Sequence, residues 1–178
     1  MKSKWNIDPT HSEVNFKVKH LVISTVTGSF RKFNGQVETA GDSDDFTNAK
    51  VQFEIDAASI DTNQADRDNH LRADDFFNVA QFPTITFDST AFTKKDEDTY
   101  SLEGNLTIRD ITKPVSLDVD FGGATTDHYG NYKAGFEVSG KIKRKEFGLT
   151  WSAVTEAGSV VLGDDIRLAI SVQLAKEA

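Results

Sequence analysis

The amino-acid sequence predicts an all-β protein, an antiparallel up-and-down β-barrel of about eight strands with one short helical excursion. Three observations support this fold class. Apolar and polar residues alternate along most of the chain, which is the period of strands with one buried face. A single stretch near the middle, residues 59–83, lacks this alternation. Long strands with one apolar face leave exposed edges, and closing the sheet into a barrel removes those edges.

The alternating segments follow one another along the whole chain. In the first clear strand, Val14, Phe16 and Val18 alternate with polar or charged neighbours. The last one, from Ile166 to Leu174, is the most regular. Further alternating segments begin near Val51, Ile85, Leu102, Val115 and Tyr132. Each is therefore expected to be a strand with one face toward the barrel interior.

Several residues interrupt this pattern. The apolar run at residues 21–23 suggests a bulge, a bend or an apolar rim. Gly28 and Gly35 predict bends or bulges, because glycine inside a strand pattern often marks one. Pro114 is expected to start a strand, where its missing N–H is tolerated. Residues 122–131 are interpreted as a loop or a long hairpin end.

The stretch from Ser59 to Pro83 is predicted to be a short, broken helix over about residues 62–80. Asp61 or Thr62 can cap it, because a short side-chain oxygen accepts from the free N–H groups of a first helical turn. The stretch ends in three phenylalanines, Phe76, Phe77 and Phe82. They either plug one end of the barrel or form a lid over an apolar cavity. The plug is favoured on residue type alone, because aromatic clusters are usually core.

Length and composition restrict the class of protein. The 178 residues fit one domain, predicted to span residues 1–178. There is no cysteine, which excludes disulfides and thiolate metal ligands and fits a reducing compartment. No secretory signal is recognised and no stretch approaches the ~20 apolar residues of a membrane span, so we expect a cytoplasmic protein without stable membrane insertion. The net charge of −8 argues against nucleic acid as a partner.

The sequence predicts neither catalytic residues, nor a metal site, nor a cofactor. The four histidines are too scattered for a zinc site. The acidic tract at residues 42–45 is expected to be a solvated loop, because Thr47 and Phe53 stand where a calcium loop needs glycine and glutamate. Neither a phosphate-binding glycine loop nor a nucleophile elbow is present. The pairs Asp74-Asp75 and Asp164-Asp165 are interpreted as turn or helix-start residues.

Two polar segments keep alternative interpretations. Residues 67–70 (RDNH) directly precede the aromatic cluster, so they either bind an anionic or hydroxylated head group at a cavity mouth or form a local network of capping contacts and salt bridges. Residues 143–145 (KRK) are the densest basic patch. They are interpreted as a solvated strand end, with head-group docking as the alternative.

Six motifs in a fixed order resemble a known family. They are WNIDPTHSEVNFKVKH, GSFRKFNG, SIDTNQADRDNHLRADDFFNVAQFPTITF, GNLTIRDITKPV, KAGFEVSGKIKRKEFGL and GDDIRLAISVQL. Together they resemble the YceI-like, polyisoprenoid-binding family, and the resemblance runs nearly from end to end. The block RDNHLRADDFF, followed by FP, is the most specific of these motifs.

This resemblance implies an extended, lipocalin-like barrel whose interior holds a long isoprenoid or a similar amphiphilic chain. The helical excursion would cover one side of the cavity, and the family suggests a homodimer without agreed catalytic residues. Members often carry a secretory signal, which is not recognised here. The candidates for lining or closing the cavity are Phe16, Val18, Phe30, Phe33, Leu71, Phe76, Phe77, Phe87, Phe136 and Trp151. The candidates for contacting a head group are His20, Arg67 and His70.

Three functions follow as alternatives. The preferred one is non-catalytic binding, carriage or sequestration of a long apolar molecule, such as a polyprenyl or quinone-like chain, inside the barrel. The second is a barrel filled by its own side chains, whose acidic surface acts in protein interaction or stress. The third is an enzyme that modifies a bound lipid, with Arg67, Asp68 and His70 at the cavity mouth. The volume inside the barrel distinguishes the first alternative from the second.

Overall fold

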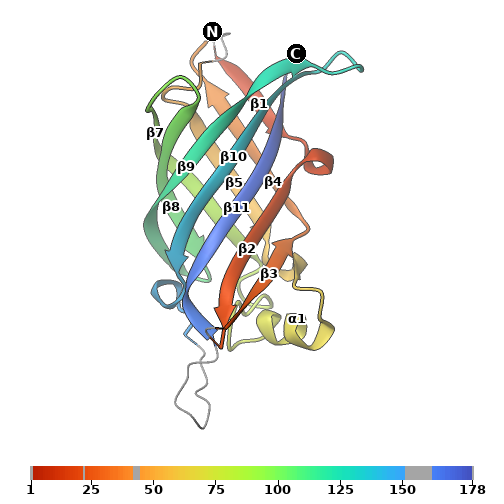
Figure 1. Cartoon of the computed structure of the whole chain (residues 1–178), viewed down its shortest axis with the longest axis vertical. Helices are drawn as coiled ribbons and strands as arrows, with labels where there is room; N and C mark the ends of the chain where they lie inside the picture. The colour runs from red at the N-terminus through yellow and green to blue at the C-terminus, as the bar shows by residue number, and fades with distance from the viewer. Residues whose placement is uncertain (1, 22, 42–44, 151–161, 178) are drawn as a thin grey trace.

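The computed structural model describes residues 2–21, 23–41, 45–150 and 162–177 of the chain. Within these ranges, 11 strands form one antiparallel sheet that closes into a tall barrel (Figure 1). The strands are β1 (Ser3–Ile7), β2 (Glu13–His20), β3 (Ser24–Phe30), β4 (Phe33–Thr39), β5 (Lys50–Asp56), β6 (Ile60–Asp61), β7 (Thr84–Lys94), β8 (Thr99–Ile108), β9 (Ile111–Thr126), β10 (Tyr132–Lys143) and β11 (Leu162–Lys176). The helical elements are α1 (Ala65–Arg72) and the 3₁₀ turns η1 (Pro9–His11), η2 (Ala57–Ser59) and η3 (Arg144–Phe147).

The sheet closes because β1 pairs with β4 on one side and with β11 on the other. Strand β11 also pairs with β2, from Leu162 to Ser171, and with β1 only beyond that. Strands β1 and β2 therefore share one strand position of the barrel, with a bend between them. Strands β3 and β4 share a second bent position in the same way, since β3 pairs with β2 and β4 with β1. The predicted class, an all-β antiparallel barrel of about eight strand positions, is confirmed. Below, the end that carries α1 is the lower end, and the opposite end is the upper end (Figure 1).

A charged network fixes the bend between β1 and β2. The Asp8 carboxylate accepts hydrogen bonds from the backbone N–H and the hydroxyl of Thr10, at 3.0 and 2.7 Å. The Lys133 ammonium of β10 donates to the same carboxylate, and His11 Nδ1 lies 2.9 Å from it. Lys133, and then Thr10, hold the pKa of the Asp8 carboxyl well below its usual range. The network therefore joins the bend to a strand more than a hundred residues away.

Replacing Asp8 by asparagine is expected to lower the free energy of unfolding at pH 7 by about 2 kcal/mol, because the charged hydrogen bonds of the carboxylate are lost. The folded-state pKa of Asp8 is depressed, so its stabilisation is present above the unfolded pKa of about 3.9 and is lost as the pH falls below it. Urea unfolding at several pH values measures this. The difference between the two proteins should shrink from pH 7 toward strongly acidic pH, and a constant difference would contradict the assignment.

The helical excursion is shorter than predicted. Helix α1 begins after Gln64, whose side chain accepts from the backbone N–H of Arg67 at 2.6 Å, so the predicted caps Asp61 and Thr62 are wrong. Those two residues lie before the helix, Asp61 at the end of β6 and Thr62 just beyond it. The helix ends at Arg72, and residues 73–82 consist mainly of turns in place of the helix expected to reach about residue 80. Helix and turns lie at the lower end of the barrel (Figure 1).

Several predicted interruptions lie inside continuous strands. Gly28 pairs in register with Phe16, and Gly35 pairs in register with Phe53, so the expected bends or bulges at these glycines are wrong. Pro114 lies within β9 and not at its start. Strand β9 also continues through residues 122–126 and pairs with β10 there, with a register shift at Gly135 and Phe136, so residues 122–131 form the long hairpin end and not the loop. The hairpin turn is confined to residues 127–131.

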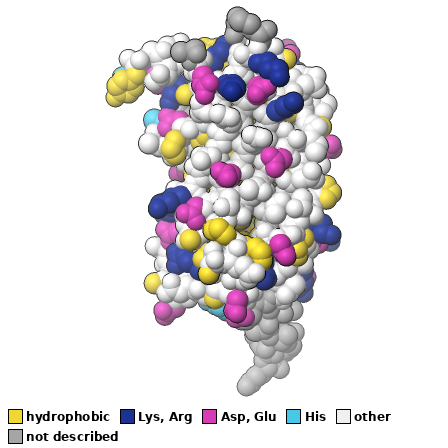
Figure 2. All heavy atoms as spheres, turned by 180° about the vertical axis from the view of Figure 1, so that it is seen from behind, with side chains coloured by type: hydrophobic (Ala, Val, Ile, Leu, Met, Phe, Trp, Pro, Cys, Tyr) yellow, Lys and Arg dark blue, Asp and Glu magenta, His cyan; other side chains and the backbone are white. Residues whose placement is uncertain are grey.

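The back face of the barrel is mixed in charge. Figure 2 shows acidic and basic side chains interspersed over the back face, which carries no large patch of one sign. Among the described residues, few large hydrophobic side chains are exposed to solvent. Ile23 in the β2–β3 turn is one of them, with 85% exposure. No helix in the described ranges has the length and apolar character needed to cross a bilayer.

Candidate functional site

The barrel encloses an apolar cavity of about 330 Å³. Its wall extends from Phe46 and Leu174 near the upper end to His20 and Leu162 near the lower end. This volume falls at the lower end of the range found for small-molecule sites. The side chains of the described residues therefore leave part of the interior open, in contrast to the second function considered from the sequence.

Strand β11 shows how alternate side chains of one strand form the cavity wall. Ile166, Leu168, Ile170 and Val172 point inward and line the cavity, whereas the intervening Arg167 and Ala169 are exposed outside. The four inward side chains are only half-buried, although they lie inside the barrel. Apolar side chains at the centre of a filled core would be fully buried, so their accessibility results from the open cavity.

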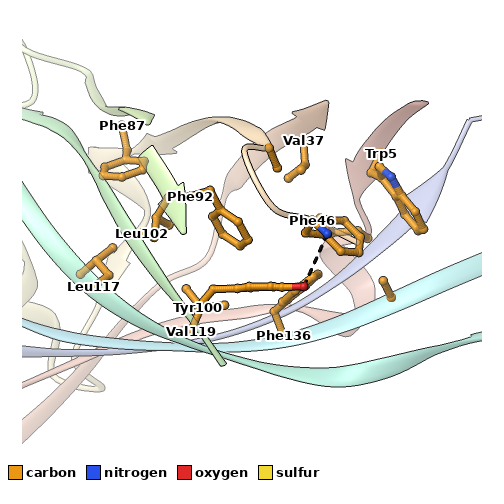
Figure 3. Close-up of a cluster of buried hydrophobic side chains, with 13 residues drawn as sticks. Trp5, Val37, Phe46, Phe87, Phe92, Tyr100, Leu102, Leu117, Val119 and Phe136 are labelled. Atoms are coloured by element: carbon orange, nitrogen blue, oxygen red, sulfur yellow. Dashed lines mark hydrogen bonds between the residues drawn. The ribbon is translucent and has the colours of Figure 1, made fainter. Parts of the chain in front are cut away.

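Aromatic side chains close the upper end. Figure 3 shows Phe46 between Trp5, Tyr100 and Phe136. The Phe46 ring packs edge-on against Phe136, with centroids 4.8 Å apart, and lies 5.1 Å from the Trp5 ring. Phe46, Trp5 and Tyr100 are each at most 1% exposed. The upper end is therefore sealed from solvent by packed rings.

The lower end is covered by a second apolar cluster. Phe76 and Phe77, from the turns that follow α1, are both buried and line the cavity. The Phe77 ring meets Phe30 edge-on at 5.9 Å, and Phe30 in turn contacts Phe16 at 5.5 Å. Leu71 of α1 packs against the same cluster. Phe76 and Phe77 thus lie over an apolar cavity, which is the lid alternative, whereas Phe82 does not line the cavity and its ring lies 5.6 Å from the Arg109 guanidinium carbon.

Two glycines let aromatic rings lie flat along the wall. A Cβ atom at Gly28 would lie 2.3 Å from Cζ of Phe16, its cross-strand partner, and one at Gly104 would lie 2.5 Å from Cζ of Phe87. These distances are far below van der Waals contact. The rings occupy the space that side chains would take at these glycines, which keeps them out of the centre of the barrel.

Replacing Gly28 by alanine is expected to displace the Phe16 ring into the cavity and to weaken binding of any guest there. Because the ring is the movable end of its side chain, we expect the fold to persist. Gly135→Ala is the matched control, since a Cβ atom there meets nothing within 4 Å. Affinity for a fluorescent lipid probe and the thermal midpoint measure the two effects. Equal probe affinity in both variants would show that the Gly28 contact does not control the cavity.

Polar side chains reach the cavity only at a few points, most of them near the lower end. Arg67 donates from Nε to the Thr62 hydroxyl and from Nη2 to the Thr62 carbonyl, both at 2.7 Å. The buried Asp68 carboxylate accepts from the Thr62 backbone N–H at 2.8 Å. His70 packs edge-on against Phe76 and lies 3.1 Å from an oxygen of Asp75. The local network considered for residues 67–70 is thus present, and Arg67 and His70 line the cavity, while head-group binding there stays a prediction.

Arg144 is a wall residue that sequence reasoning missed. It was interpreted as part of a solvated or head-group-docking patch, yet its side chain is 1% exposed and lines the cavity. It donates to the carbonyl oxygens of Gly163, Leu149 and Leu162 at 2.8, 2.6 and 3.2 Å. Burial lowers the pKa of the guanidinium, and Asp164 partly opposes this. The sequence did contain a pattern that could have predicted this. Arg144 lies two residues after the inward-facing Ile142, and side chains two residues apart in a strand point to the same face.

The structure brings most of the proposed site residues to one cavity. The wall includes Phe16, Val18, His20, Phe30, Arg67, His70, Leu71, Phe76, Phe77, Phe87 and Phe136. Phe33 is not brought to the wall, because its ring stacks on Phe53 at 5.9 Å and it is Phe53 that lines the cavity. Trp151 lies outside the described residues. Contact of these side chains with a ligand stays a prediction.

The remaining candidates for metal binding lie apart from one another in the described ranges. No group of three or more His, Cys, Asp or Glu side chains is gathered there in a way that could hold a metal ion. His11 belongs to the Asp8 network and His128 stacks on Tyr129 at the surface, so neither joins the two histidines of the cavity wall.

Four matches place this architecture among known proteins. The model of the YceI-like domain matches residues 5–174. A UPF0312 protein of Pectobacterium atrosepticum is 41% identical over 170 residues, which cover 96% of this chain and 84% of that protein. The crystal structure of a Campylobacter jejuni YceI protein is similar with a TM-score of 0.74 and 34% identity, covering 90% of each chain. A polyisoprenoid-binding domain from Saccharophagus degradans has a TM-score of 0.74 at 16% identity, covering 97% of this chain and 98% of that one.

Proposed function

This chain belongs to the YceI-like family, and we propose that it binds and carries one long-chain isoprenoid or a similar amphiphilic lipid inside its barrel, without catalysis. The observation that carries the proposal is the enclosed apolar cavity, with its aromatic closed end and its few polar groups. The same fold occurs in the polyisoprenoid-binding domain of Saccharophagus degradans, so it is compatible with a guest of this class.

Burial of the tail supplies the binding free energy. Each methylene removed from water contributes about 0.8 kcal/mol, so a tail with roughly fifteen buried carbons contributes about 12 kcal/mol. The loss of translational and rotational freedom costs at least about 4 kcal/mol. At most ~8 kcal/mol then remains, which corresponds to micromolar affinity at best. Affinity should therefore depend mainly on the tail, with tolerance among polyprenyl, quinone-like and fatty chains.

The head group would lie at the polar lower end, near His20, Arg67 and His70. Arg67 holds Thr62 through Nε and Nη2, and its Nη1 has no hydrogen-bond partner in the part of the chain that the structure describes. A guanidinium nitrogen at the mouth of an apolar cavity suits an anionic or hydroxylated head group. This contact would orient the guest, whereas the tail would provide most of the affinity.

Native mass spectrometry of freshly purified protein tests the proposal, followed by organic extraction and mass analysis of the extract. We expect a 1:1 complex with an apolar mass that is lost on denaturation. Protein stripped of lipid should take up a polyprenyl alcohol added in detergent micelles. Protein that carries no guest and also rejects polyprenyl, quinone-like and fatty chains would overturn the proposal.

A further inference from the structure

The upper end of the cavity is closed by a side chain that does not belong to the barrel strands. Phe46 lies in the connection between β4 and β5, and it is fully buried. The other upper wall residues, such as Phe92, Val119 and Phe136, stand on strands and form the sides of the cavity. Phe46 instead stands on a loop, and Figure 3 shows its ring between the side chains of Trp5, Tyr100 and Phe136.

Phe46 marks where the cavity stops. Its ring lines the cavity, and it also packs against Trp5 and Phe121, at 5.1 and 5.8 Å between ring centroids. Neither Trp5 nor Phe121 lines the cavity, although both belong to the same apolar cluster or pack directly against it. The Phe46 ring therefore borders both the cavity and the packed apolar side chains beyond it.

The backbone around Phe46 is held in place. The Asn48 N–H donates to the Phe92 carbonyl of β7 at 2.8 Å, and the Ala49 N–H donates to the Phe46 carbonyl at 2.9 Å. The Phe46 N–H points to the Tyr100 hydroxyl of β8, at 3.5 Å (Figure 3). These contacts connect the segment to two neighbouring strands, so the ring is a fixed end wall.

We propose that Phe46 sets the maximum length of the chain that the barrel accepts. This inference rests on the proposed function, because it concerns the far end of the same cavity. A tail that enters with its head group at the lower end meets the Phe46 ring last. A tail longer than the distance to this ring must leave carbons outside the barrel, where they gain no burial free energy.

The test uses a series of all-trans prenyl alcohols that differ by one isoprene unit, bound to the full-length protein and measured by native mass spectrometry and by displacement of a fluorescent lipid. In the wild type, affinity should rise with length and then level off. In Phe46→Ala, the plateau should move to longer alcohols by about one isoprene unit. Each added unit below the plateau should strengthen binding by more than tenfold, since about 1.4 kcal/mol corresponds to tenfold.

Phe121→Ala is the matched control, because it removes a ring that packs behind Phe46 and does not border the cavity. Both variants should lose stability, and only Phe46→Ala should move the plateau. An unchanged plateau in folded Phe46→Ala, or the same movement in both variants, would overturn the inference while the wild type still binds. A wild type that binds no alcohol of the series, nor any other apolar chain, would overturn the proposed function instead. If Phe46→Ala does not fold, Phe46→Leu gives the same test with a smaller movement.

Discussion

The Leu168→Trp variant is expected to fold and to lose the bound chain. Leu168 lines the cavity from β11 and packs against both the upper and the lower apolar clusters, so it lies where the two meet. In a filled core, inserting a larger side chain costs about 1–3 kcal/mol. Here the indole can enter open space, where it would divide the cavity. We expect affinity for polyprenyl alcohols to fall by more than about tenfold, a loss above 1.4 kcal/mol.

The control for this variant is Ala169→Trp, which places the same side chain on the outer face of the same strand. Ala169 is exposed, so its replacement should leave lipid affinity unchanged. Displacement of a fluorescent lipid and the thermal midpoint are measured for both variants. If folded Leu168→Trp retains wild-type affinity, the guest does not occupy the middle of the barrel.

The Arg144→Leu variant is expected to lose at least about 3 kcal/mol of stability. The guanidinium donates to three carbonyl oxygens, and each buried acceptor left without its donor costs about 1–3 kcal/mol. These bonds join η3 and the residue after Gly148 to the start of β11, so their loss should loosen the lower end of the barrel. Urea unfolding monitored by intrinsic fluorescence and circular dichroism measures the effect.

The adjacent Lys143 provides the control. It is exposed, and its side chain points to the outer face of β10, opposite to that of the inward-facing Ile142. Lys143→Leu should change stability by no more than about 0.5 kcal/mol, as is usual for surface substitutions. A loss of no more than about 0.5 kcal/mol in Arg144→Leu as well would contradict the role of the buried guanidinium and support a solvated strand end, which is the interpretation favoured by the sequence.

The alternation of apolar and polar residues was sufficient to predict the strands and most residues of the cavity wall. Because side chains alternate between the two faces of a strand, the positions of Phe16, Val18 and Phe136 already determined that they share the inner face with their cross-strand neighbours. The helical excursion was located correctly, and its limits were not. Gln64 acts as the cap in place of Asp61 or Thr62, since Thr62 is engaged by Arg67 and Asp68. Which residue caps the helix depends on tertiary contacts, and helix-capping propensities do not include these contacts.

The sequence by itself determined a closed antiparallel barrel with an apolar inner face, because a period of two assigns each side chain to one face. Only the tertiary structure decided whether the inward-facing side chains of opposite strands touch one another or leave a cavity between them. That outcome depends on the volumes of side chains brought together from opposite strands, on rings such as Phe16 lying flat on Gly28, and on Phe46 closing one end from a loop. Burial of Arg144 was decided in the same way, since its acceptors come from segments that only the closed barrel places around it.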